Sequence, residues 1–227
     1  MVSLFFFFLP FWQPANTSPT FEWGWVKEYF QEGEIQMKEF YISTLREQLG
    51  PDYKNKLYLD EKTVSHDELR HLSVRYLGFD GAAHQGQLIV HEDVATEALE
   101  IFQELYELGF PIEKINLVSD YGYSDDLSMA DNNSSGFNFR YIEGTGELSW
   151  HAFGRAIDIN PLQNPYILKT GQVLPAGGAV YTDRSLQAQG MIEEDSPVVK
   201  IFKDRGWDWG GDWDHPKDYH HFEKPSQ

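Results

Sequence analysis

The stretch SWHAFGRAIDINP, residues 149–161, sets a histidine and an aspartate on either side of a small glycine. In its AIDIN segment, Ile157 and Ile159 point to one face of a strand, because side chains alternate along an extended chain. Asp158 therefore points to the opposite face, where its carboxylate either meets solvent or holds a cation. The stretch predicts a strand with an apolar core side and a polar open side.

A second two-sided segment closes the chain, the stretch DYHHFEK at residues 218–224. We expect Phe222 to enter the core, so that His221 and Glu223 point to the opposite side. Asp158 points to that same side. The two strands therefore bring polar side chains from distant parts of the sequence onto one surface.

A third alternating segment, GFNFR at residues 136–140, places Arg140 opposite its two phenylalanines and on the same open surface. His151 lies just before the AIDIN strand, and with Asp158 and His221 it completes a set of two histidines and one aspartate. This is the ligand set of an open catalytic zinc site, which keeps a fourth position for water. The sequence therefore predicts a metal site of the catalytic type.

A general base is needed beside such a metal, and Asp218 is the candidate. It precedes His221 by three residues, and residues three apart point to opposite faces of a regular strand. Both can serve one site only if Asp218 lies in the turn leading into the strand, and DHPKD at residues 214–218 is a suitable turn sequence. We expect Arg140 to stabilise an oxyanion or a substrate carboxylate, and Glu223 to hydrogen-bond a histidine ligand.

The composition narrows the classes of partner. The chain has 227 residues, with 18 Lys and Arg against 36 Asp and Glu, and a formal net charge of −18. This excess of acids disfavours a nucleic-acid backbone or an anionic membrane surface as partner, and it suits cationic ligands such as metals. The chain contains no cysteine, so disulfides and thiolate zinc sites are excluded and a metal site must use histidine, aspartate and glutamate.

Three segments are expected along the chain. Residues 1–20 hold an apolar run too short to span a bilayer, which predicts either a degraded signal peptide or a hydrophobic arm that docks on the body. Residues 21–71 form an N-terminal extension in which helical spacing continues to about Leu49. Residues 72–227 form the catalytic domain that carries the predicted zinc site. We expect no stable membrane insertion and a monomeric protein.

Strands and helices do not alternate regularly in the third segment. This order predicts an α+β fold, in which a small antiparallel sheet has helices packed on one face and the zinc cleft on the other. The expected elements are strands at LSVRYLGF (72–79), GQLIVH (86–91) and KINLVSD (114–120) and helices at 91–110 and 196–206.

The motifs SWHAFGRAID and DYHHFE closely resemble the S-x-H-x-x-G-x-A-x-D and [DE]-x-x-H motifs of the VanX/VanY-type zinc D-alanyl-D-alanine peptidases and L-alanyl-D-glutamate endopeptidases. The resemblance covers roughly residues 72–225 and implies a core shared with the hedgehog signalling domain. It implies a zinc enzyme that cuts peptidoglycan stem peptides, in the cell envelope or after secretion, with a cytoplasmic location as the alternative. It leaves open whether the enzyme is a carboxypeptidase or an endopeptidase.

The resemblance also implies a role for each matching residue. His220 offers a second candidate ligand beside His221, but the motif spacing and the strand pattern both favour His221. The implied roles are zinc ligands for His151, Asp158 and His221, general base and acid for Asp218, substrate or transition-state binding for Arg140, and a structural role for Ser149.

Two other functions use the same residues. A non-catalytic, zinc-dependent binding module of the same fold would keep the metal, but it has no need of a base at Asp218. An iron oxygenase also uses two histidines and one carboxylate. Its usual H-x-[DE] motif places two ligands two residues apart on one strand, whereas His151 and Asp158 are seven apart.

Overall fold

The computed structural model describes residues 39–142 and 145–226. The expectations for residues 1–20, and for the helical pattern at residues 21–38, lie outside this part of the chain. The described residues form a mixed α+β structure with several helices and small, mainly antiparallel sheets, which confirms the predicted fold class.

The secondary structure follows in chain order. The helices are α1 (Leu45–Leu49), α2 (Tyr53–Lys56), α3 (Glu92–Leu108), α4 (Asp125–Ala130) and α5 (Pro197–Lys203), with 3-10 turns that include η3 (Trp150–Phe153). The strands are β1 (Tyr41–Thr44), β2 (Leu69–Leu77), β3 (Ala83–His91), β4 (Lys114–Ile115), β5 (Asn133–Ser134), β6 (Ala156–Asp158), β7 (Tyr166–Ile167), β8 (Val173–Leu174), β9 (Asp208–Trp209), β10 (Lys217–Asp218) and β11 (His221–Glu223).

One antiparallel sheet has the order β1-β2-β3, and α3 packs against it. The side chain of His91 caps the start of α3 by accepting a hydrogen bond from the backbone N–H of Asp93, and Gly109 ends the helix in the left-handed conformation. The helix predicted at 91–110 is therefore confirmed. Its buried stripe comprises Val94, Ala95, Ala98, Ile101, Phe102 and Leu105.

A second antiparallel sheet has the order β6-β11-β9 and carries the motif residues. Phe222 in β11 lies opposite Ile157 in β6 on one side and Trp209 in β9 on the other. Its ring is fully buried and stacks on Phe202 of α5, with ring centroids 3.8 Å apart. Phe222 therefore enters the core as predicted, and the short helix expected near 196–206 is confirmed as α5.

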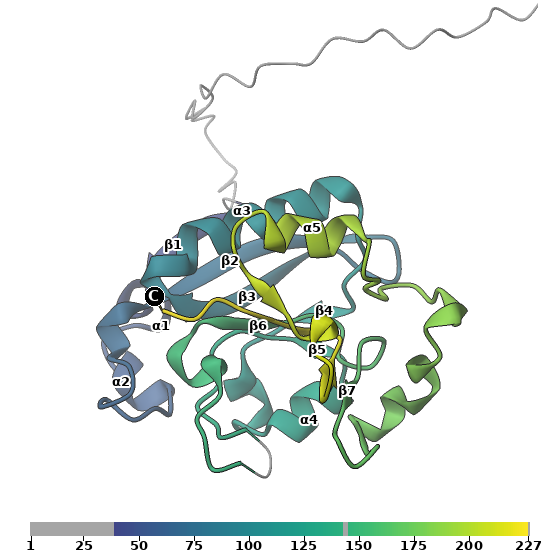
Figure 1. Cartoon of the computed structure of the whole chain (residues 1–227). Helices are drawn as coiled ribbons and strands as arrows, with labels where there is room; N and C mark the ends of the chain where they lie inside the picture. Colours follow the sequence, from purple (N-terminus) through teal and green to yellow (C-terminus); the bar gives the residue numbers. More distant parts are fainter. Residues whose placement is uncertain (1–38, 143–144, 227) are drawn as a thin grey trace, which may run out of the picture. The chain divides into compact units, whose positions relative to one another are not determined.

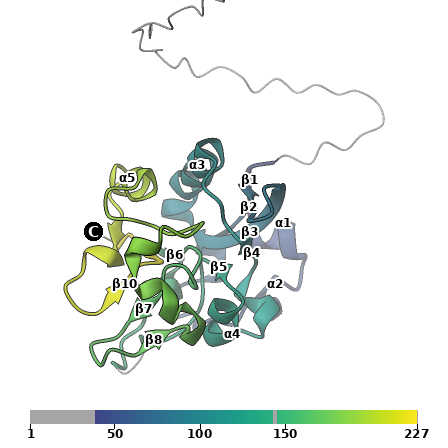
Figure 2. The same ribbon diagram turned by 90° about the vertical axis from the view of Figure 1, so that its right-hand side faces the viewer.

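Helices α3 and α5 lie side by side on one side of the sheets, and α4 and β7 lie on the opposite side (Figure 1 and Figure 2). The apolar core fills the first side, because α3 and α5 cover the buried side chains of β2, β9 and β11. The second side contains the ends of the short strands and the loops between them. The elements that carry Asp125, Tyr166 and Asp218 belong to this second side.

Several local predictions are wrong where a distant contact decides the structure. The spacing near Tyr41 predicted a helix, but Tyr41–Thr44 pairs with β2 as strand β1. In KINLVSD only Lys114–Ile115 is strand, and residues 136–140 form no regular element. The expected boundary between residues 71 and 72 falls inside β2, so β1 and α1 belong to the same compact unit as the elements that follow.

Gly154 ends η3 and allows the close approach of two segments. Its φ is +68°, and a Cβ there would lie 2.6 Å from the backbone nitrogen of His91 and 2.9 Å from Leu69 Cδ2. We expect Gly154→Ala to lower the free energy of unfolding by about 2–4 kcal/mol, because backbone strain and a steric clash act together. Chemical denaturation measures the change. Gly122→Ala is the control, because Gly122 has φ +62° but nothing within 4 Å of an added Cβ, so this variant should show only the cost of backbone strain. An equal loss of unfolding free energy in both variants would contradict the steric clash at Gly154.

Candidate active site

Two adjacent strands and one turn bring His151, Asp158 and His221 together. The β6–β11 register sets His221 opposite Asp158, and His221 Nδ1 lies 3.0 Å from Asp158 Oδ1. His151 lies in η3, just before β6, and its Nε2 lies 3.0 Å from Asp158 Oδ2 and 3.2 Å from His221 Nδ1. All three side chains are buried. Their ligand atoms lie within 4.8 Å of one another, and the group could hold a metal ion.

The hydrogen bonds of each imidazole leave the correct nitrogen for a metal. His151 Nδ1 lies 2.6 Å from the carbonyl oxygen of Gly136, which can only accept, so Nδ1 donates and Nε2 keeps its lone pair. His221 Nε2 lies 2.9 Å from Glu223 Oε2 and donates in the same way, which leaves Nδ1. Separations of 3.0–3.2 Å approach the edge of about 3.3 Å expected for a tetrahedral zinc site. The donor set therefore fits a divalent metal.

The charges of the buried side chains depend on one another. Burial opposes ionisation of Asp158, but its contacts with His151, His220 and His221 hold the pKa of this carboxyl well below its usual range. Burial likewise opposes protonation of His221. Its hydrogen bonds to Asp158 and Glu223 outweigh that effect and raise its pKa to about 10. In the absence of a metal, both ring nitrogens of His221 therefore carry a proton at neutral pH, and the imidazole is positively charged.

Zinc binding is expected to release about one proton from His221 at pH 7.5. The ligand nitrogen must be neutral, whereas a pKa of about 10 keeps the metal-free imidazole protonated at that pH. Calorimetric titration in two buffers with different ionisation enthalpies measures the release. Above about pH 10, proton release from His221 should vanish, and the affinity for zinc should stop rising with pH. A proton count at pH 7.5 that is zero would contradict the protonated state of His221.

Asp218 lies in strand β10, which pairs with β7, and a bend at residues 219–220 separates it from β11. The prediction that Asp218 lies in a turn is therefore wrong. The bend after it nevertheless lets Asp218 and His221 line the same cleft. Asp218 is buried, and its Oδ1 has no hydrogen-bond partner among the described residues. Burial raises the pKa of this carboxyl. A buried carboxylate oxygen without a partner is costly, and it is available to a proton-bearing group in the cleft.

His220 faces Asp218 rather than completing the cluster of ligands. Its Nδ1 donates to the carbonyl oxygen of Asn164 at 2.7 Å, and its Nε2 lies 3.1 Å from Asp218 Oδ1. That last contact is an ion-pair approach and not an aligned hydrogen bond. His220 Nε2 is 3.8 Å from Asp158 Oδ2, so the structure groups His221, and not His220, with His151 and Asp158.

Arg140 reaches the cluster from an irregular segment and not from a strand. Its Nη2 lies 3.8 Å from Asp158 Oδ2, and its Nε lies 3.2 Å from Asp125 Oδ2. Burial opposes its charge, but Asp125 and Asp158 outweigh burial and raise its pKa. Sequence reasoning missed Asp125, which follows the N-cap Ser124 of α4; a capped acidic first turn beside the predicted arginine was the available signal.

Ser149 and Glu223 support the histidines. The hydroxyl of Ser149 caps η3 by accepting from the backbone N–H of His151. Glu223 receives the hydrogen bond from His221 described above. Sequence reasoning missed Gly136 and Asn164, whose backbone carbonyl oxygens orient the imidazoles of His151 and His220. Every residue has a backbone carbonyl, so the residue type does not indicate such an acceptor.

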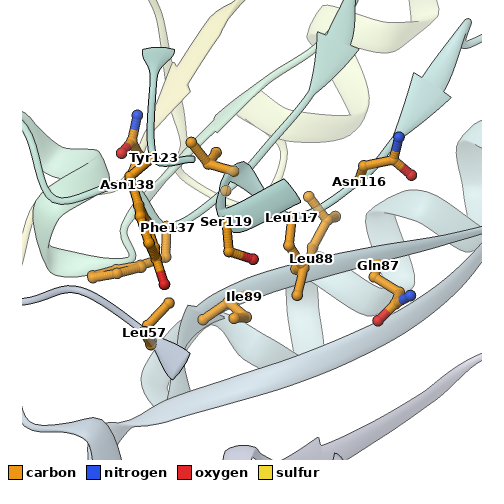
Figure 3. Close-up of a pocket in the computed structure, with 12 residues that line it drawn as sticks. Leu57, Gln87, Leu88, Ile89, Asn116, Leu117, Ser119, Tyr123, Phe137 and Asn138 are labelled. Carbon is orange, nitrogen blue, oxygen red and sulfur yellow. The ribbon is translucent and has the colours of Figure 1, made fainter. Parts of the chain in front are cut away.

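The cluster opens into a cleft of about 650 Å³. Arg140, Asp218 and His221 line it, and the ring of Trp213 lies against the ring of His221 with centroids 5.6 Å apart. A separate pocket, drawn in Figure 3, has room for about 10 Å³, no more than one water molecule. Leu57, Ile89 and other apolar side chains line it, so it is a packing gap and not a ligand site.

Residues 143–224 match the family model described as D-alanyl-D-alanine carboxypeptidase. The resemblance to VanX/VanY-type peptidases is thereby confirmed over this segment, which contains the three buried cluster residues and Asp218 but not Arg140. No curated protein and no solved structure matches the chain. Among the described residues, no helix has the length and apolar character needed to cross a membrane.

Proposed function

We propose that this chain, which carries the D-alanyl-D-alanine carboxypeptidase signature at residues 143–224, is a zinc peptidase that hydrolyses peptidoglycan stem peptides. One observation carries the proposal: the ligand nitrogens of His151 and His221 and a carboxylate oxygen of Asp158 lie within 4.8 Å of one another, and His221 lines a large cleft. A cleft of this size accommodates a short peptide. Because such peptides belong to the cell wall, we propose action in the cell envelope.

Each residue then has a chemical task. When bound, zinc with an open coordination position lowers the pKa of water and polarises a carbonyl group. Asp218 takes the proton from the attacking water and delivers it to the amine that leaves when the peptide bond breaks. Its raised pKa suits this exchange, since a carboxylate with a pKa nearer neutrality takes the proton from water more readily and can still return it to the amine. Arg140 places positive charge beside the developing oxyanion.

Asp218 also supports catalysis over a binding module of the same fold. A module that only held zinc would have no use for a buried carboxylate with an oxygen, Asp218 Oδ1, that accepts no aligned hydrogen bond, because such a group destabilises the fold. Active sites are where costs of this kind are tolerated. The zinc-binding module therefore remains the weaker alternative.

The direct test incubates the zinc-loaded protein with defined muropeptides and identifies the products by mass spectrometry. Loss of one terminal alanine would identify a D,D-carboxypeptidase, and separation of L-alanine from the rest of the stem would identify an endopeptidase. Protein stripped of metal by a chelator is the control and should leave every substrate intact. Unchanged masses with zinc-loaded protein would contradict the proposed activity.

A further inference from the structure

A row of aromatic side chains continues from the cleft across the surface. It comprises Tyr123, Tyr58, Phe139 and Tyr141, and we call it the aromatic row. Neighbouring ring centroids are 6.2 Å, 5.6 Å and 6.5 Å apart in that order. Tyr58 and Tyr141 are 62% and 58% exposed, and Tyr123 is 37% exposed. Large aromatic side chains exposed in one contiguous row on a protein surface indicate a binding surface.

The row is joined to the site through Tyr141. This residue lines the same cleft as Arg140, Asp218 and His221. A substrate seated in the cleft can therefore extend along the row without a break. Phe139, the next ring, lies one residue before Arg140, so the row and the catalytic cleft share one segment of chain.

The rings are held in place despite their exposure. Phe139 packs against the smaller core cluster that contains Leu57 and Phe137. The hydroxyl of Tyr123 donates to the backbone carbonyl of Lys56, and Tyr58 meets Phe139 edge to face. Rings that are already ordered lose little conformational entropy when a ligand covers them, which favours binding.

We propose that the aromatic row binds the glycan strand to which the stem peptide is attached. This inference rests on the proposed function, and it names glycan-linked peptide, not free peptide, as the substrate. Sugar rings present C–H groups of slightly positive charge, and these pack on the negative faces of aromatic rings. Tyrosine also offers hydroxyls to sugar hydroxyls. A lipid surface fits poorly, because the chain carries a net charge of −18 and anionic membranes would repel it.

The test compares one stem peptide in two forms, free and attached to glycan oligomers. Tyr58→Ala removes an exposed ring that does not line the cleft, so peptide contacts stay unchanged. We expect kcat/KM to fall about three- to tenfold on the glycan-linked substrate and to stay unchanged on the free peptide. Tyr58→Phe keeps the ring and should retain most of the activity. Leu108→Ala, a 46% exposed position at the end of α3, is the control and should alter neither rate.

Binding provides a readout that does not depend on hydrolysis. Glycan strands stripped of peptide should bind wild-type protein and bind Tyr58→Ala less tightly, as followed by the intrinsic fluorescence of the protein. An equal loss on both substrates, or no loss on either, would overturn the proposal, as would retention on anionic vesicles in place of glycan. If the wild-type protein binds glycan but cleaves no muropeptide, the proposed peptidase activity fails while the aromatic row stands.

Discussion

The Asp218→Asn variant is expected to keep its metal and to lose activity by a factor of about 10²–10⁴. Asparagine has the shape of aspartate but cannot accept and return a proton. Asp218 is not among the three residues that could hold the metal, so zinc content should stay at one per chain. Asp218 Oδ1 accepts no hydrogen bond in the folded protein, so the substitution of Asp218 by asparagine should not lower the stability. Steady-state rates, zinc content and the melting temperature test these three expectations together.

Asp214→Asn supplies the matched control, because it makes the same chemical change at an exposed position four residues earlier. It should leave rate, metal content and stability unchanged. If Asp218→Asn retained more than about a tenth of the activity, proton transfer would have to be assigned to another group. If it instead lost zinc, Asp218 would be a ligand and the proposed division of roles would be wrong.

The regular elements that build the site could be predicted from the sequence. Alternation in AIDIN and HHFE indicates which side chains enter the core, and Ile157 and Phe222 lie opposite each other on that buried side. Helices α3 and α5 could be predicted because their caps lie within a few residues of the helices themselves. Local physical chemistry decides these elements, so a single sequence carries the signal.

The remaining parts of the site depend on contacts between distant residues. His220 is oriented by the carbonyl of Asn164, 56 residues earlier, and Asp218 is placed by a two-residue strand that pairs with β7. Neither element is long enough to show periodicity. The helical spacing near Tyr41 was overridden by hydrogen bonds to β2, since pairing with a buried strand outweighs local propensity. Strand alternation predicted that Arg140 lies near Asp158, and it does. The segment that carries Arg140 is irregular, however, and the predicted strand is wrong.

Asp158→Asn is expected to abolish metal binding and to reduce hydrolysis to the uncatalysed background. The carboxylate is the one anionic member of the cluster, and it contacts the ligand nitrogens of both His151 and His221. An amide has no negative charge and lowers the affinity for a divalent ion. Metal analysis of the purified variant after dialysis against zinc measures the loss.

The same substitution should lower the stability of the metal-free protein by about 3 kcal/mol, the lower end of the cost of breaking a buried ion pair. Asp158 is 2% exposed and lies among His221, which is protonated in the metal-free state, and Arg140. Without it, the pKa of His221 should fall, since only Glu223 and Asp218 remain of the three carboxylates that raise it. Glu223 and Asp125 remain to balance part of the charge, which limits the loss.

Asp125→Asn, which removes a partner of Arg140 but no metal ligand, is the control and should keep zinc and most of the stability. If Asp158→Asn still bound one zinc ion per chain, the three-residue cluster would not be the metal site. The basis for assigning a peptidase would then be lost.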